Sequence, residues 1–153
     1  MRVCVLDKHK LFILNAELYK AFFPTHNIFQ GTIAQIISYL ESQEHKIIVA
    51  VTEETIVAGT LLVNFGANAE RTHLLWKLRH FAFNSEEIAV QLLAQAEAHI
   101  HAASQTAKIE LTIAETEQGI AFYKSQGYMT EGTLRNHYRW GETCYILGKS
   151  LPQ

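Results

Sequence analysis

Apolar and polar residues alternate along some stretches of the chain and recur with a helical period along others. Strict alternation over residues 108–114 places Ile109, Leu111 and Ile113 on one face of a predicted strand. A helical stripe near the N-terminus predicts a helix that ends at about Phe22, before Pro24. Strands and helices therefore follow one another without an internal repeat or a linker.

The whole pattern predicts an α+β chain with seven strands and four helices. The predicted strands cover residues 3–6, 46–52, 56–65, 72–83, 108–114, 128–138 and 142–149. The first predicted helix is capped by Asp7, and the next two cover residues 31–43 and 85–103. The fourth is short: Thr116 caps it, Glu117 lies in its first turn, and Gly127 follows its end. Two hairpins are expected, one turning at residues 53–55 and one at Trp140-Gly141.

The stretch 72–83 changes its alternation part-way along. Leu74, Trp76 and Leu78 share one parity, whereas Phe81 and Phe83 share the other. One interpretation is an extra residue near position 80, because a bulge would bring both sets to one face. The other is a central strand that is buried on both faces.

Length and charge narrow the class of protein. A chain of 153 residues is expected to form one domain, residues 1–153, with a core that needs no disulfides. The net charge of −2 offers no basic field for nucleic acid and no polybasic membrane patch. Cys4 and Cys144 lie in apolar strands and are expected to be buried thiols, and no apolar run is long enough to cross a membrane. We expect a soluble, cytoplasmic protein.

The C-terminal third carries a more specific pattern. A strand is followed by Gly119-Ile-Ala-Phe-Tyr-Lys-Ser-Gln-Gly-Tyr128 and then by a hairpin that ends in Lys149 and Leu151. This order, with its glycines and aromatic residues at fixed offsets, resembles the GNAT superfamily of acyl-CoA-dependent N-acyltransferases. The resemblance implies a single domain with a mixed, mostly antiparallel sheet of six or seven strands flanked by four helices. It also implies that the fourth and fifth strands, residues 72–83 and 108–114, splay apart at a bulge.

The resemblance implies acetyl-CoA as co-substrate, and the spacing of the Cys and His residues gives no reason to expect a metal. In the family the pantetheine arm lies between the splayed strands and the pyrophosphate lies at the N-terminus of the following helix, where free N–H groups and the helix dipole attract an anion. The implied coenzyme-binding residues come from the fourth strand, the helix N-terminus and the end of the fifth strand: Phe81, Ala82, Phe83, Ser85, Glu86, Glu87, Ile88, Ala89 and Thr116.

The pyrophosphate loop departs from the family pattern. Ala89 fits, but Asn84 stands in place of the usual Arg or Gln, and Glu87 stands in place of a glycine. In one interpretation Asn84 or Ser85 caps an ordinary helix and the two carboxylates weaken or abolish coenzyme binding. In the other the carboxylates point away and the backbone amides still face the phosphates.

The resemblance also suggests roles in catalysis. Tyr123 occupies the position of the family's general acid, which protonates the leaving thiolate, and a packed aromatic is the alternative. His80, at the suspected bulge, is the candidate general base, with Glu115 and His137 as weaker ones, and a structural imidazole is the alternative. His99 and His101 do not share a helix face and do not suggest a metal site.

Two functions from different classes follow. The first is an N-acetyltransferase that moves an acetyl group from acetyl-CoA directly to a primary amine, on a small molecule or a peptide, in a ternary complex. The alternative is a catalytically impaired GNAT-fold binding or regulatory module with weak or no affinity for coenzyme A. A homodimer formed through the aromatic residues Tyr138, Trp140 and Tyr145 is a further hypothesis.

Overall fold

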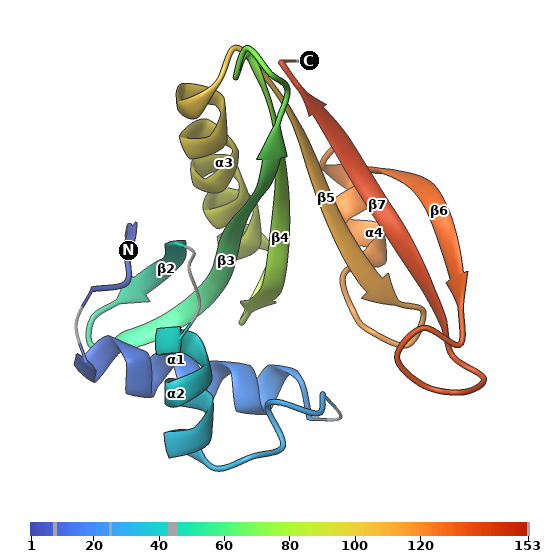
Figure 1. Cartoon of the computed structure of the whole chain (residues 1–153). Coiled ribbons are helices and arrows are strands. Elements are labelled where there is room, and N and C mark those ends of the chain that lie inside the picture. The colour runs from blue at the N-terminus through green and yellow to red at the C-terminus, as the bar shows by residue number, and fades with distance from the viewer. Residues whose placement is uncertain (8, 25, 43–45, 153) are drawn as a thin grey trace. The chain divides into compact units, whose positions relative to one another are not determined.

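The computed structural model describes residues 1–7, 9–24, 26–42 and 46–152 (Figure 1). The helices are α1 (His9–Phe22), α2 (Ile33–Ser42), α3 (Glu86–Ala103) and α4 (Ile120–Ser125). The strands are β1 (Arg2–Val5), β2 (Lys46–Thr52), β3 (Thr55–Ala67), β4 (His73–Phe83), β5 (Thr106–Ala114), β6 (Met129–Arg135) and β7 (Thr143–Leu151).

These strands form one sheet in the order β1-β2-β3-β4-β5-β7-β6. β4 and β5 run parallel, whereas the pairs β1–β2, β2–β3, β5–β7 and β6–β7 are antiparallel. The predicted α+β class, with a mostly antiparallel sheet and four helices, is confirmed over the described residues. The cap predicted at Asp7 and the helix end predicted at Gln43 depend on positions 8 and 43, which lie outside the described residues.

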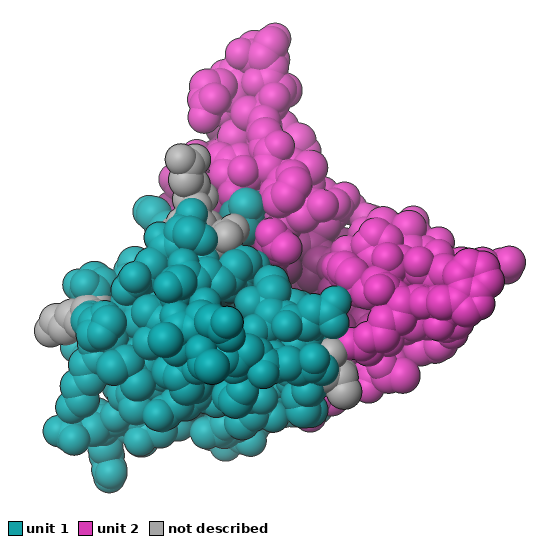
Figure 2. Space-filling view, turned by 60° about the horizontal axis from the view of Figure 1, so that its bottom comes forward, with its two compact units in different colours: residues 1–63, 80–97 teal, residues 64–79, 98–153 magenta. Residues whose placement is uncertain are grey.

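The chain packs into two compact units, coloured separately in Figure 2. Unit 1 comprises residues 1–63 and 80–97, and unit 2 comprises residues 64–79 and 98–153. The single domain expected for residues 1–153 stays a prediction.

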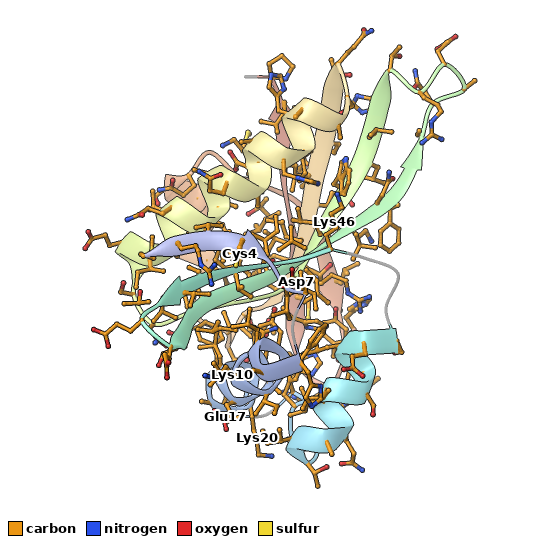
Figure 3. All side chains as sticks on the ribbon, turned by 90° about the vertical axis from the view of Figure 1, so that its left-hand side faces the viewer. Cys4, Asp7, Lys10, Glu17, Lys20 and Lys46 are labelled. Atoms are coloured by element: carbon orange, nitrogen blue, oxygen red, sulfur yellow. The ribbon has the colours of Figure 1, made fainter. Side chains whose placement is uncertain are left out.

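Unit 1 holds a core between α1, α2 and the first strands. Figures 1 and 3 show α1 and α2 on the same side of β2. The amphipathic stripes of both helices turn inward, and Ala16, Tyr19 and Ile36 are fully buried. The loop between the helices ends in a capping box, because Gln35 N–H donates to Thr32 Oγ1 (3.2 Å) and Thr32 N–H donates to Gln35 Oε1 (2.8 Å).

Unit 2 is built on β5, which pairs with β7 from Ala107↔Leu151 to Ala114↔Cys144. The predicted face of β5 is buried, with Ile109, Leu111 and Ile113 among the core residues. The thiol of Cys144 is buried as expected, and burial raises its pKa, whereas Cys4 of β1 in unit 1 is only half-buried. No helix in the described part of the chain is long and apolar enough to cross a membrane.

Candidate functional site

β4 carries the change of parity that the sequence indicated. Leu74, Trp76 and Leu78 are buried at alternate positions, and the next buried residues are Phe81 and Ala82. Between the two sets His80 has a left-handed backbone with φ of 53°. A left-handed residue within a strand is typical of one type of bulge, so this backbone favours the predicted bulge over a regular strand buried on both faces.

The ladder between β4 and β5 is shorter than either strand. Their paired residues run from His73↔Thr106 to Lys77↔Glu110. β4 nevertheless continues to Phe83 and β5 continues to Ala114. Residues 81–83 of β4 therefore lie beyond the last pair of this ladder, as the predicted parting of the two strands requires.

The N-terminus of α3 follows directly after β4 in unit 1. Ser85 is the capping residue, because its hydroxyl accepts the N–H of Ile88 (3.4 Å) and its carbonyl accepts the N–H of Ala89 (3.0 Å). The side chains of Glu86 and Glu87 are exposed in the first turn, whereas Ala89 is fully buried. Carboxylates at this end stabilise a helix by about 0.3–1 kcal/mol each, and they lower its attraction for another anion.

His80 lies among aromatic rings of unit 1. The hydroxyl of Tyr39 on α2 is 2.8 Å from His80 Nε2, a hydrogen-bond distance. The imidazole centroid lies 4.9 Å from the ring of Phe29 and 5.2 Å from that of His26.

The sequence pointed to His80 but not to Tyr39, which lies off the apolar stripe of α2 and 41 residues away along the chain. The crowding of Tyr19, Phe22, Phe23, His26 and Phe29 within eleven positions was the available signal.

Tyr123 lies on α4 in unit 2 and is only 4% exposed. Its ring centroid is 5.2 Å from that of Phe122 and 5.8 Å from that of Tyr128. Burial, with a smaller contribution from the negative charge of Glu117, raises the pKa of the phenol well above its usual range. Tyr123 therefore stays protonated throughout the neutral range.

The predicted start of this helix is wrong. α4 begins at Ile120, Gly119 is its N-cap with φ of 115°, and no side chain caps it. Residues 114–117 form a tight turn instead: the N–H of Glu117 donates to the carbonyl of Ala114 (2.9 Å), and the N–H of Ala114 donates to a carboxylate oxygen of Glu117 (2.7 Å). Thr116 is exposed beside this turn, three positions before the cap. Gly127, with φ of 91°, follows the last turn as predicted.

The candidate residues divide between the units. His80, the end of β4 and the start of α3 belong to unit 1, whereas Thr116 and Tyr123 belong to unit 2. Among the described residues, no group of three or more His, Cys, Asp and Glu side chains is arranged to hold a metal ion.

Solved structures share this arrangement over nearly the whole chain. The aminoglycoside 6'-N-acetyltransferase from Enterococcus faecium matches with a TM-score of 0.80 at 15% identity, covering 100% of this chain and 99% of that one. A putative acetyltransferase of the GNAT family from Desulfovibrio desulfuricans matches with a TM-score of 0.65 at 17% identity, covering 97% and 96%. The chain has the GNAT fold. Arabidopsis thaliana Naa50, solved with the bisubstrate analogue CoA-Ac-MVNAL, matches with a TM-score of 0.71 at 16% identity, covering 97% and 99%.

No protein-family model matches the sequence, and no curated protein matches it. Identities of 15–17% to the solved GNAT proteins show a common backbone arrangement and leave the side-chain chemistry to be argued from this chain. The resemblance read from the C-terminal third is therefore confirmed at the level of the GNAT fold.

Proposed function

We propose that the protein transfers an acetyl group from acetyl-CoA directly to a primary amine in a ternary complex. The observation that supports this most is the short β4–β5 ladder, which ends at Lys77↔Glu110 while both strands run on. In a GNAT fold this is where the thioester arm of coenzyme A adds to the sheet. Two of the solved neighbours were determined with coenzyme A or a coenzyme A conjugate bound.

The backbone supplies most of the proposed coenzyme site. The main-chain groups of Phe81, Ala82 and Phe83 lie beyond the ladder and would bind the pantetheine arm and the oxyanion of the tetrahedral intermediate. The amides of Ser85, Glu86 and Glu87 would face the pyrophosphate, and Ile88 and Ala89, whose N–H groups bond to Ser85, would complete this first turn. The hydroxyl of Thr116 would add one hydrogen bond. Backbone donors keep their geometry when the side chains change, so the site can tolerate the unusual loop sequence.

The proposed reaction forms the C–N bond of an amide and breaks the C–S bond of the thioester. The amine nitrogen attacks the thioester carbon, the C–S bond breaks, and an amide and free coenzyme A result. His80 is the proposed base, which takes the proton that the amine loses, directly or through a water molecule.

Tyr123 is the proposed acid that protonates the leaving sulfur. Its raised pKa keeps the proton available but makes complete transfer costly, since each pKa unit corresponds to about 1.4 kcal/mol. Its main contribution would be a hydrogen bond to the developing thiolate.

A second candidate is a GNAT-fold binding module without transferase activity. Exposed carboxylates at Glu86 and Glu87 in the first turn of α3 favour it. A carboxylate about 5 Å from a phosphate costs roughly 3 kcal/mol at an effective dielectric constant of about 20, and solvent reduces this to a fraction at an exposed site. The penalty is therefore smaller than the binding free energy of an ordinary micromolar ligand, about 8 kcal/mol.

Thermal stability measured against acetyl-CoA concentration tests the proposal. The wild type should show a saturable rise in Tm, because a ligand that binds only the folded state stabilises it. Glu87→Gln should bind acetyl-CoA about two- to fivefold more tightly through reduced repulsion. Glu54→Gln is the matched control, since it removes one exposed carboxylate from the β2–β3 turn and should leave the affinity unchanged.

Transfer itself is measured as thiol released from acetyl-CoA in the presence of primary amines. Absence of any Tm shift for the wild type at millimolar acetyl-CoA would contradict the proposal. Saturable binding without thiol release from any primary amine would contradict the transfer step, whereas the absence of binding is the result expected of the binding module.

A further inference from the structure

Eight rings of unit 1 form a group around His80 that we call the aromatic cluster. Its members come from α1, the α1–α2 connection, α2 and the end of β4: Tyr19, Phe22, Phe23, His26, Phe29, Tyr39, His80 and Phe83. The His80 centroid lies 4.9–6.4 Å from the rings of five other members. The cluster continues past them, since the ring of Phe22 lies 5.1 Å from that of Phe83.

The aromatic cluster has a buried floor and a half-buried rim. Tyr19 and Phe29 are fully buried. The other six rings, including those of Phe23, Tyr39 and His80, are half-buried and so keep part of their surface in contact with solvent. The candidate base therefore stands at an aromatic surface rather than in a closed core.

The segment that supplies most of these rings contains no carboxylate. Residues 18–40 contain no Asp or Glu, and their one Lys or Arg is Lys20, labelled on α1 in Figure 3. The ammonium of Lys20 donates to the carbonyls of Gly31 (2.5 Å) and Gln30 (3.4 Å), so its charge is directed at the backbone. Two carboxylates flank the segment: Glu17, labelled on α1 in Figure 3, and Glu41, whose Oε1 lies 3.7 Å from His9 Nδ1. Within residues 18–40, an amine beside His80 would meet aromatic rings and no acidic side chain.

We infer that the acceptor is an arylalkyl primary amine, an inference that rests on the proposed acetyltransferase function and on His80 as its base. An aryl group of the acceptor would pack edge-to-face or offset against the rim rings. A single ammonium is attracted to ring faces, yet an apolar surrounding favours the neutral amine that must attack the thioester. In the transfer step this amine loses one proton to His80, forms the C–N bond as the C–S bond breaks, and leaves as the N-acetyl amide.

The same surface disfavours polycationic acceptors. An aminoglycoside or a polyamine would bring several ammonium groups, and each would lose hydration at the rings without gaining a carboxylate partner. The solved neighbours with the GNAT fold include aminoglycoside 6'-N-acetyltransferases. The acceptor of the present chain is therefore inferred from its own aromatic cluster and not from theirs.

A panel of acceptors with acetyl-CoA at saturation tests the inference on the wild type. The panel contains 2-phenylethylamine, propylamine, spermidine, kanamycin and a short peptide that begins with alanine. We expect kcat/KM for 2-phenylethylamine to exceed the value for propylamine by roughly tenfold or more, through ring packing and burial. Higher kcat/KM for kanamycin, spermidine or the peptide than for 2-phenylethylamine would overturn the inference.

A pair of matched variants tests the position of the aryl site. Phe23→Leu keeps an apolar side chain but removes one ring of the rim, and it should lower kcat/KM for 2-phenylethylamine about three- to tenfold while changing that for propylamine less than twofold. Phe65→Leu is the control, because Phe65 is 51% exposed in unit 2 and its ring faces the ammonium of Lys77 at 4.2 Å. An equal loss for both amines in Phe23→Leu would place the aryl group elsewhere and overturn the assignment to this rim.

Failure of the inference and failure of the proposed function give different results. Acetyl-CoA binding and thiol release without a preference for 2-phenylethylamine would refute the aryl site and leave the transferase intact. Absence of acetyl-CoA binding would refute the transferase, and saturable stabilisation by 2-phenylethylamine but not by spermidine would then still support the aryl site. If Phe23→Leu does not fold, the wild-type panel decides.

Discussion

At the scale of single residues, His80 combines a strained backbone with a defined side-chain partner. A non-glycine residue in the left-handed region costs about 1–3 kcal/mol and persists where the surroundings hold it. Tyr39 is one such constraint, with its hydroxyl 2.8 Å from His80 Nε2. If Nε2 carries the hydrogen and Tyr39 accepts it, the lone pair lies on Nδ1, and only this tautomer leaves Nδ1 able to take a proton from an amine.

Tyr39→Phe tests this role as a positioning residue. The variant removes the partner of Nε2 but keeps the ring, so we expect a three- to tenfold lower kcat with an unchanged KM for acetyl-CoA. Nitrogen-15 NMR of the His80 imidazole should report the Nε2–H tautomer in the wild type and a mixture of tautomers in the variant. A wild-type imidazole protonated at Nδ1 would exclude the proposed role of His80, and an unchanged tautomer in Tyr39→Phe would exclude that of Tyr39.

Glu117 gives unit 2 a pH-dependent stability. Burial raises the pKa of its carboxyl group, more than the hydrogen bond from Ala114 N–H lowers it, and nearby Glu142 raises it further. Between the unfolded and folded pKa values the folded state binds more protons, so stability falls as pH rises through this window. At pH values above this window, the buried and ionised carboxylate of Glu117 still destabilises the folded state.

Glu117→Gln should therefore stabilise the protein at neutral pH, since the amide oxygen can still accept the Ala114 N–H without a charge. Urea unfolding between pH 4 and pH 8 should show the variant gaining on the wild type as pH rises. A stability difference that does not depend on pH would contradict the stated role of the carboxyl group. Glu54→Gln, an exposed carboxylate, again serves as the control.

At the scale of elements, α1 packs on β3 through a glycine. A Cβ atom added to Gly59 would lie 2.6 Å from Oδ1 of Asn15 and 3.5 Å from the hydroxyl of Tyr19. Asn15 is fully buried, and neither of its side-chain amide atoms has a hydrogen-bond partner among the described residues. The close approach of the helix therefore depends on the missing side chain of Gly59.

We expect Gly59→Ala to lower the free energy of unfolding by about 1–3 kcal/mol through overpacking. The double variant Asn15→Ala/Gly59→Ala should be more stable than the sum of the single changes implies, because Asn15→Ala removes the atom that clashes. Chemical denaturation of the four proteins of this cycle measures the coupling. Additive single effects would mean that the two side chains do not compete for the same space.

Helices and strands with a clear hydrophobic periodicity were predictable from the sequence, whereas the residues at which they end were harder to predict. β2 has the bounds predicted for it, 46–52, because Glu53 and Glu54 interrupt its apolar run. The predicted 128–138 strand stops earlier, at Arg135, because Asn136 turns to a left-handed φ of 53° and its carboxamide accepts the N–H of Gly141 (2.6 Å). Such a local hydrogen bond competes with the ladder, and the strand pattern alone does not show it.

The candidate site was likewise predictable from the sequence only in part. The parity change within β4 was enough to single out His80, because a bulge leaves a trace in the alternation. Tyr39 and His26 left no such trace, since only the packing of α2 and the α1–α2 connection brings their rings to His80. Thr116 was assigned as a cap from its residue type, and the carboxylate of Glu117 formed the competing turn.

At the scale of the whole molecule, the GNAT fold is reached with few shared residues. A TM-score of 0.80 at 15% identity means that the pattern of buried positions, and not their identity, sets the backbone path. The pattern is satisfied here by an α1 and an α1–α2 connection that are rich in aromatic residues. Differences between GNAT proteins in what they bind are then expected where side chains, rather than main-chain groups, form the site.

The two compact units are joined within regular elements, not through loops. Their boundaries fall after Val63 in β3, after Arg79 in β4 and after Glu97 in α3. Each unit consequently consists of two separate stretches of polypeptide, and an exchange of one unit with a homologous protein would require three cuts, each through a strand or a helix. Recombination between genes is therefore a poor way of giving this protein a new half, and point substitution is the easier way of changing what it does.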